Sequence, residues 1–345
     1  MKPITRKYFT PLPAKRIGAG RVIVCSFPLG IASGSGWVSS RIASRVGFES
    51  VIARSEAWIA KVFWAVFGAA LMPFLHPAFT RFLPLQKVCR NANKQIWLDL
   101  SQTFGLAFFF DRAVLICHDL QCHRPHRLKS WARASERFLL RRAAMVVVLS
   151  DRDATIVRRM YGIKSARILN IVPLIVPTMA PFLISFDGPI TRAAFLGSMD
   201  RVENRQAVQW LVENIFPRVP ALMVTIIGRP SPPDEIAHPQ LVYRGFVSDL
   251  AQELSRHAVL LAPLASPAGI KIKVLEALLA QRAVLGTPSA YSGLPKPDDR
   301  AWVTSCPERW AATLSHPPHF RITSGSVSRA LPAARDIDYT PWLNF

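Results

Sequence analysis

Cysteine, acidic side chains and long hydrophobic runs are all scarce in this chain of 345 residues. The five cysteines have no regular spacing, which argues against a disulfide framework and favours a reducing compartment. The longest apolar run, residues 62–75, contains a proline and is shorter than the roughly 20 residues that a membrane-spanning helix needs. We therefore expect no transmembrane helix.

The apolar run allows two interpretations. A buried helix is the ordinary one. A helix lying in a membrane interface is the alternative, supported by the neighbouring aromatic residues Trp58, Phe63, Trp64 and Phe67. Residues 1–20 are basic and lack the apolar core of a signal peptide, so we expect a flexible basic arm there.

Positive charge is in excess and unevenly distributed. The formal net charge is +21, with 43 Lys and Arg residues against 22 Asp and Glu. The composition is 50% hydrophobic, which excludes a generally disordered chain. Residues 1–178 hold 27 basic and 8 acidic residues, a net charge of +19, whereas residues 179–345 hold 16 and 14, a net charge of +2. This asymmetry predicts a negatively charged partner for the N-terminal half.

Within that half, residues 121–160 are the most basic stretch. Arg133, Arg137 and Arg141 recur every four residues, so a helix would present them as one positive ridge. No helix-turn-helix, zinc finger or aromatic stacking platform accompanies the ridge, so we expect no nucleic acid and favour an anionic membrane surface. A charged face that is simply solvated is the bland alternative.

Short apolar runs alternate with helical patterns along most of the chain, as in βα units on a parallel sheet. This rhythm predicts two doubly wound α/β domains, with a ligand at the carboxyl ends of the strands. Predicted strands are residues 22–25, 113–117, 144–149, 193–196, 223–227, 241–243, 258–262 and 283–285; predicted helices are residues 128–142, 151–161, 205–216, 248–255 and 271–281.

The domain boundaries follow from composition. Prolines at positions 173, 177 and 181 interrupt both periodicities and indicate an interdomain linker. The expected organisation is an arm at 1–20, an acceptor-side domain at 21–178, a linker at 179–190, a nucleotide-sugar-binding domain at 191–315, and a tail at 316–345 packing back on the N-terminal domain.

The most informative stretch is a predicted strand, a Pro/Gly loop and a helix start that carries two lysines and a glutamate. Backbone N–H groups at such a helix start, next to Gly269, attract phosphate, and Lys271 and Lys273 add positive charge. Glu276 lies one turn beyond Lys273, so the pair could meet a diphosphate and a neighbouring ribose. A surface helix with an ordinary Lys–Glu pair is the alternative.

The pattern Gly-x3-Lys-x-Leu-Glu-Ala, read from Gly269 to Ala277, resembles the donor-binding signature of retaining GT-B glycosyltransferases. These are the group 1, family 4-like enzymes of bacterial polysaccharide or lipid-linked glycan synthesis. The resemblance covers residues 192–294 well and 113–161 more weakly. Further similar segments are residues 195–200, 226–228, 245–249, 262–264 and 286–294.

The resemblance implies an α/β GT-B fold, in which two Rossmann-like domains face a central cleft. It also implies roles for individual residues. Glu276 would bind the ribose hydroxyls, Lys273 would neutralise the diphosphate with help from Lys271 or Arg229, and Gly245 would lie near the base. His118 would face the donor sugar, assisted by Asp119. The remaining implied positions are Gly197 and Ser198 for the donor, and Gly34, Ser35 and Gly36 for the phosphates or the acceptor.

The chain also departs from the family pattern. Ala268 stands where many relatives have the first Glu of a Glu-x7-Glu motif. Ser198 and Asn204 stand where others have Arg and Lys. The phosphate clamp must then depend mainly on Lys273.

The expected function is metal-independent glycosyl (hexosyl) transfer with retention, from a UDP- or GDP-linked sugar to a lipid-linked or polysaccharide acceptor. We expect no cofactor and a peripheral position at the cytoplasmic face of the plasma membrane. The pairs Cys117–His118 and Cys122–His123 lack the usual zinc spacing, so no metal site is expected. Alternatives are a nucleotide-sugar epimerase, an inverting GT-B transferase, or a basic membrane- or nucleic-acid-binding module on a degenerate GT-B scaffold.

Overall fold

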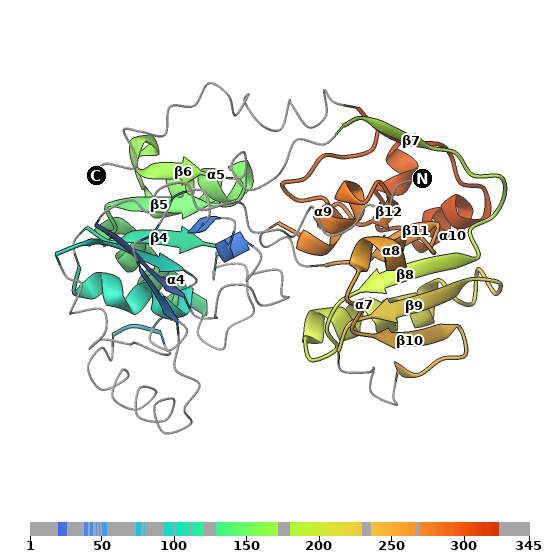
Figure 1. The fold of residues 1–345 in the computed structure, drawn as a ribbon, viewed down its shortest axis with the longest axis horizontal. Helices are drawn as coiled ribbons and strands as arrows, with labels where there is room; N and C mark the ends of the chain where they lie inside the picture. The colour runs from blue at the N-terminus through green and yellow to red at the C-terminus, as the bar shows by residue number, and fades with distance from the viewer. Residues whose placement is uncertain are drawn as a thin grey trace. The chain divides into compact units, whose positions relative to one another are not determined.

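The computed structural model divides into two compact units, with the boundary between residues 177 and 178 (Figure 1). The predicted turn at Gly34, Ser35 and Gly36, the arm at 1–19, linker residues 172–179, Gly269 and tail residues 324–345 lie outside the described residues. The structure describes residues 20–25, 38–40, 42–43, 46, 48, 50–53, 74–76, 79, 93–99, 101–110, 112–120, 129–171, 180–229, 236–265 and 270–323.

The N-terminal unit is built on a parallel sheet with strand order β2-β1-β3-β4-β5-β6. Its central strands are apolar on both faces, as expected where helices cover both sides of a sheet. The order reverses direction between β1 and β3, which marks a topological switch point. The strands are β1 (Arg21–Cys25), β2 (Ser50–Ala53), β3 (Gln95–Asp99), β4 (Val114–Cys117), β5 (Met145–Val148) and β6 (Ile168–Asn170).

The helices of this unit follow local sequence signals. In α5 (Asp151–Tyr161), the Ser150 hydroxyl caps the amino end by accepting from the Asp153 N–H, and Gly162 closes the carboxyl end at φ 67°. This confirms the helix predicted over residues 151–161. The other described helical segments are η2 (Ser101–Phe108), α4 (Lys129–Arg142) and η4 (Ser165–Arg167).

The C-terminal unit has a second parallel sheet with strand order β10-β9-β8-β11-β12. All five of its strands were predicted within a few residues. The strands are β8 (Arg192–Leu196), β9 (Met223–Ile227), β10 (Leu241–Gly245), β11 (Val259–Ala262) and β12 (Ala283–Gly286); the helical segments are α7 (Val202–Asn214), α8 (Leu250–Leu254), α9 (Ile272–Leu279), η6 (Arg300–Trp302) and α10 (Pro307–Ser315).

A two-stranded antiparallel ribbon completes this unit: β7 (Phe182–Ile184) pairs with β13 (Phe320–Ile322). The rings of Phe182 and Phe320 lie 5.9 Å apart, and Phe320 packs edge-on against the buried Trp302 at 5.2 Å. Residues 182–184 were assigned to the linker and residues 320–322 to a tail on the N-terminal domain. Their apolar side chains instead bring both segments into the C-terminal unit.

The predicted fold class, two Rossmann-like α/β domains with parallel sheets, is confirmed. Among the described residues, no helix combines the length and apolar character needed to cross a bilayer.

Candidate functional site

The switch point of the C-terminal sheet lies between β8 and β11, which are neighbours in the sheet although two strands separate them in the chain. Open α/β sheets bind ligands at the carboxyl ends of the strands that flank such a point. Here β8 ends at Leu196 and β11 ends at Ala262. The segments that follow them lead into α7 and α9, so residues early in both helices lie at the predicted ligand position.

Asn204, in the first turn of α7, joins the two segments. Its Nδ2 donates to the Ser198 carbonyl oxygen at 2.7 Å. Its Oδ1 accepts from the Lys273 Nζ at 2.8 Å. The same Nζ lies 4.6 Å from the centroid of the Phe195 ring, a cation–π distance. Lys273 is therefore fixed at the carboxyl end of β8 by a chain of contacts, although it belongs to α9.

The charge state of Lys273 is unusual for a lysine. Burial is the main reason that the pKa of Lys273 is lowered to about 7, and the positive charges of Arg201 and Lys271 act in the same direction. Burial also raises the pKa of Glu276 to about 7, against the opposing effect of the Lys273 charge. Both groups therefore titrate near neutrality, a property that clusters at functional sites.

Glycines allow the strand ends to approach closely. A Cβ on Gly197 would lie 2.6 Å from the Asn204 Nδ2, and a Cβ on Gly228 would lie 2.2 Å from the Gly197 carbonyl oxygen. Gly228 has φ 150°, and its N–H donates to the Gly245 carbonyl oxygen at 2.9 Å. Side chains at these two positions would push apart the turns that follow β8 and β9.

The other predicted donor-binding residues follow the same edge of the sheet. Ser198 follows β8, and its hydroxyl lies 3.3 Å from the Asp200 backbone nitrogen. Arg229 follows β9, and its guanidinium carbon lies 5.6 Å from the centroid of the exposed Phe246 ring. Gly245 ends β10 with φ 76°, and Lys271 directly precedes α9. Four strand ends thus carry predicted residues, in an arrangement suited to an anionic ligand.

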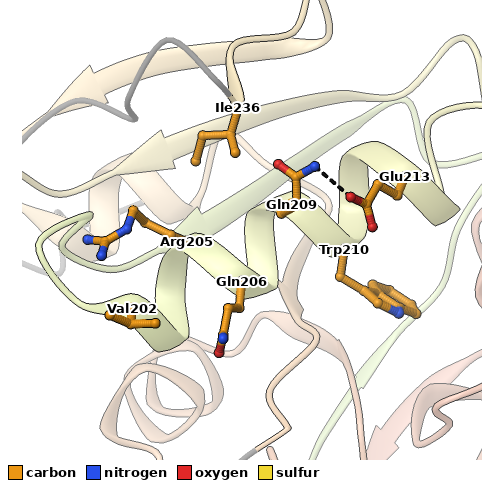
Figure 2. Close-up of a pocket in the computed structure, with 7 residues that line it drawn as sticks. All are labelled: Val202, Arg205, Gln206, Gln209, Trp210, Glu213 and Ile236. Carbon is orange, nitrogen blue, oxygen red and sulfur yellow. Dashed lines mark hydrogen bonds between the residues drawn. The ribbon is translucent and has the colours of Figure 1, made fainter.

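A shallow pocket of about 450 Å³ lies elsewhere on this unit, along α7 (Figure 2). None of the predicted site residues lines it. Gln209 donates to Glu213 at 2.6 Å inside it, while the Gln209 Oε1 is buried without a partner among the described residues. The lining residues are Val202, Arg205, Gln206, Gln209, Trp210, Glu213 and Ile236.

In the N-terminal unit, polar side chains gather at the ends of β3 and β4, beside the switch point. The Oδ1 of Asp99 lies 2.6 Å from the Nε2 of His118, and its Oδ2 accepts from the Ser39 hydroxyl at 2.5 Å. All three residues are buried. Sequence reasoning found His118 but missed Asp99 and Ser39. The signal for Asp99 was a carboxylate at the end of the apolar run Gln95–Asp99.

This cluster positions a histidine. Burial alone would lower the pKa of His118, but the charge of Asp99 and its hydrogen bond raise it above the ordinary value, with a smaller contribution from the partly buried Asp119. Asp99 connects the other two side chains, because its Oδ1 meets the His118 Nε2 and its Oδ2 accepts from the Ser39 hydroxyl. The carboxylate thereby fixes the orientation of the imidazole ring.

Among the described residues, no group of three His, Cys, Asp or Glu side chains is placed to hold an ion. Cys117 is buried, and Cys122 and His123 lie outside the described residues.

Residues 191–316 match the family model described as Glycosyl transferases group 1. No curated protein matches the sequence of the chain.

Solved structures match over nearly the whole chain. The Anabaena protein HepE in complex with UDP and glucose has a TM-score of 0.58 at 11% identity, with 93% of this chain and 95% of that chain covered. An α,α-trehalose-phosphate synthase (UDP-forming) from Burkholderia vietnamiensis has a TM-score of 0.52 at 9% identity, with 94% and 95% covered. A trehalose-6-phosphate protein from E. coli, bound with UDP-2-fluoro glucose, has a TM-score of 0.51 at 12% identity, with 94% and 97% covered. The fold is therefore GT-B, and the family match supports a GT-B glycosyltransferase.

Proposed function

We propose that this protein transfers a hexosyl group from a nucleotide-sugar to a lipid-linked or polysaccharide acceptor, with retention at the anomeric carbon. The observation that carries the proposal is the placement of Lys273. Its ammonium group is fixed at the switch point by Asn204, one helical turn from Glu276, inside the segment that matches the glycosyltransferase family. Structural neighbours with this fold hold UDP or a UDP-sugar analogue.

Lys273 neutralises the donor diphosphate in this proposal. The leaving group of glycosyl transfer is a nucleoside diphosphate whose negative charge grows as the glycosidic bond breaks. Fixed positive charge aimed at that group is usually the largest catalytic contribution. Lys271 and Arg229 supply further charge from the ends of neighbouring strands, and Glu276 accepts hydrogen bonds from the ribose hydroxyls.

The N-terminal unit orients the donor sugar through His118. The Nε2 of this ring is hydrogen-bonded to Asp99, so Nδ1 would contact a sugar hydroxyl in this proposal. Asp119, the next residue in the chain, would assist. Retention by attack on the front face requires no carboxylate base, because a donor phosphate oxygen takes the acceptor proton. Gly34, Ser35 and Gly36 remain a prediction for the phosphates or the acceptor.

The proposed acceptor and cellular position rest on charge. Residues 1–178 carry a net charge of +19. In the part of this unit whose side chains the structure describes, ten basic side chains are exposed and no acidic one is. We propose that the enzyme works at the cytoplasmic face of the plasma membrane, where anionic lipids attract such a surface.

Nucleotide binding is the first test. UDP- and GDP-linked ligands are added to the full chain and thermal unfolding is followed; at about 100 times Kd, a ligand stabilises the folded state by about 2.7 kcal/mol. Lys273→Ala and Glu276→Ala should abolish the shift. Gln209→Ala, in the shallow pocket along α7, should keep it. The absence of a shift with every nucleotide would remove the enzyme proposal and leave the basic binding module.

Product analysis separates the remaining alternatives. The anomeric configuration of the product, read by NMR, distinguishes retention from inversion, and conversion of the donor without an acceptor indicates an epimerase. Transfer in the presence of EDTA tests the proposed metal independence, which a complete loss of activity would contradict.

A further inference from the structure

Four phenylalanine side chains reach the surface of the N-terminal unit together. Their exposed fractions are 47% for Phe74, 37% for Phe108, 40% for Phe109 and 37% for Phe138. Phe108 ends η2 and Phe109 follows it directly, whereas Phe138 belongs to α4. Phe74 lies more than thirty positions before Phe108 in the chain. We call these four residues the aromatic surface.

The four rings form one contiguous group. Phe74 lies 5.6 Å from Phe108 and 5.7 Å from Phe138, measured between ring centroids. Phe108 lies 5.4 Å from Phe109 and 6.5 Å from Phe138. Single exposed apolar side chains are ordinary on protein surfaces, whereas a contiguous apolar patch marks a site of interaction.

Polar contacts hold the backbone under these rings. The Trp131 Nε1 donates to the Phe74 carbonyl oxygen at 2.7 Å. The Arg142 guanidinium carbon lies 5.5 Å from the centroid of the Phe108 ring, and its Nη2 is 3.5 Å from the Phe108 carbonyl oxygen. Both donors belong to α4, so this helix fixes segments that are far apart in the chain and aligns their rings at the surface.

Positive charge borders the aromatic surface. The exposed stripe of α4 carries Phe138 together with arginines, whereas the acidic residue of the helix, Glu136, is buried and accepts from the Tyr161 hydroxyl. No acidic side chain is exposed where the structure describes the side chains of residues 20–171. The exposed basic side chains there are Arg112, Lys129, Arg133, Arg137, Arg141, Arg142, Arg152, Arg158, Arg159 and Lys164.

We propose that the aromatic surface docks on an anionic lipid bilayer, with the phenyl rings entering the interface and the α4 arginines meeting the headgroups. Charge complementarity and aromatic insertion are the two components of interfacial binding. This deepens the proposed function by naming the surface that meets its membrane. Phe74 belongs to the apolar sequence run 62–75.

The rings fit lipid better than nucleic acid. Bases bind by stacking on open ring faces. Here Phe74 meets Phe138 at an interplanar angle of 83° and Phe109 meets Phe108 at 87°. In each pair the edge of one ring lies against the face of the other, so that face is not available for stacking. Insertion among acyl chains does not require an exposed ring face, because it depends on the apolar surface area that is removed from water.

The test is sedimentation of the full chain with phosphatidylcholine vesicles that contain or lack phosphatidylglycerol. The variants are Phe74→Ser/Phe109→Ser, at the two most exposed rings, and Arg137→Glu on α4. Leu183→Ser, at an exposed apolar residue on β7, is the matched control for the first. Arg309→Glu, at an exposed arginine on α10, is the control for the second.

The wild type should bind phosphatidylglycerol vesicles, and less so at high salt, because salt screens surface charge. The double variant should bind about a hundredfold more weakly or worse, since each of its two buried phenyl rings is worth about a tenfold factor or more. Arg137→Glu should also bind more weakly, because it places a negative charge beside the anionic headgroups. Both controls should bind as the wild type does. Retained nucleotide-induced thermal shifts in the double variant would show that it is folded and that the donor site is independent of docking.

Three results would overturn the proposal: no binding to phosphatidylglycerol vesicles, equal binding of the double variant and the wild type, or equal loss in the double variant and Leu183→Ser. A single-stranded RNA is titrated in parallel. Weaker RNA binding by the double variant with unchanged vesicle binding would assign the surface to nucleic acid. A missing nucleotide shift in the wild type would affect the proposed function and leave the docking result standing.

Discussion

The side chain of Asn204 accepts a hydrogen bond from the Lys273 Nζ at 2.8 Å and donates one to the Ser198 carbonyl oxygen at 2.7 Å. Ser198 and Asn204, which stand where the family pattern has basic residues, are thereby connected to Lys273. Asn204 does not replace a positive charge, but it determines where the positive charge of Lys273 lies.

Asn204→Ala should therefore weaken nucleotide-sugar binding without removing the lysine. A hydrogen bond to a charged group is worth about 1.5–3 kcal/mol, so the affinity should fall by about tenfold or more. Calorimetric titration measures the affinity. Gln209→Ala, on the same helix but in the shallow pocket along α7, is the control. Equal affinities of Asn204→Ala and the wild type would show that Lys273 positions itself.

Donor affinity should be greatest near pH 7, because Glu276 loses its carboxylate charge below its pKa of about 7 and Lys273 loses its proton above its pKa of about 7. A diphosphate favours the ammonium form, so binding takes up a proton above that pH. A nucleotide-sugar is the suitable probe, because its diphosphate diester keeps a constant charge in this range. Titration in two buffers of different ionisation enthalpy measures the proton uptake. Lys273→Arg, whose guanidinium stays charged, should flatten the alkaline side of the profile; an unchanged alkaline side in this variant would assign that titration to another group.

Gly228→Ala should destabilise the C-terminal unit by about 2 kcal/mol or more, because the new Cβ would lie 2.2 Å from the Gly197 carbonyl oxygen at φ 150°. Gly188→Ala is the control, since a Cβ at Gly188 meets nothing within 4 Å. Chemical denaturation of both variants measures the difference. Similar free energies of unfolding would mean that the turns after β8 and β9 can separate without cost.

Asp99→Asn should destabilise the N-terminal unit most at low pH. Asp99 raises the pKa of His118 above its ordinary value of 6.5, so the stability that this pair contributes is fully present below that value. It is lost as the pH rises through the folded-state pKa of His118. The difference in unfolding free energy between the variant and the wild type should therefore shrink with rising pH. A difference that is constant across pH would indicate that the Ser39 contact alone is being measured.

Local sequence signals were sufficient for much of the fold. The helix over residues 151–161 has its own serine cap and terminal glycine, and β11 and β12 of the C-terminal sheet are uninterrupted apolar runs. β2, by contrast, has four residues and too short a pattern to show periodicity. β3 was missed as well, and with it Asp99, whose importance depends on His118 and on Ser39, sixty positions away.

The candidate site, too, could be predicted from the sequence only in part. Lys273 and Glu276 lie in one short motif and could be predicted together. The contact between Lys273 and Asn204 spans 69 positions and appears only when β8 and β11 become neighbours. The aromatic surface is likewise invisible in the sequence, because α4 and η2 each contribute only part of it.

The ribbon of β7 and β13 has a consequence for how this protein could have arisen. The first and last described strands of the C-terminal unit are hydrogen-bonded neighbours, from Phe182 paired with Ile322 to Ile184 paired with Phe320. Along the chain, the five-stranded sheet of this unit therefore lies between two strands that are paired with each other. Domains with adjacent ends tolerate insertion and transfer. Recombination could therefore move this unit between proteins without breaking a single pairing of its parallel sheet.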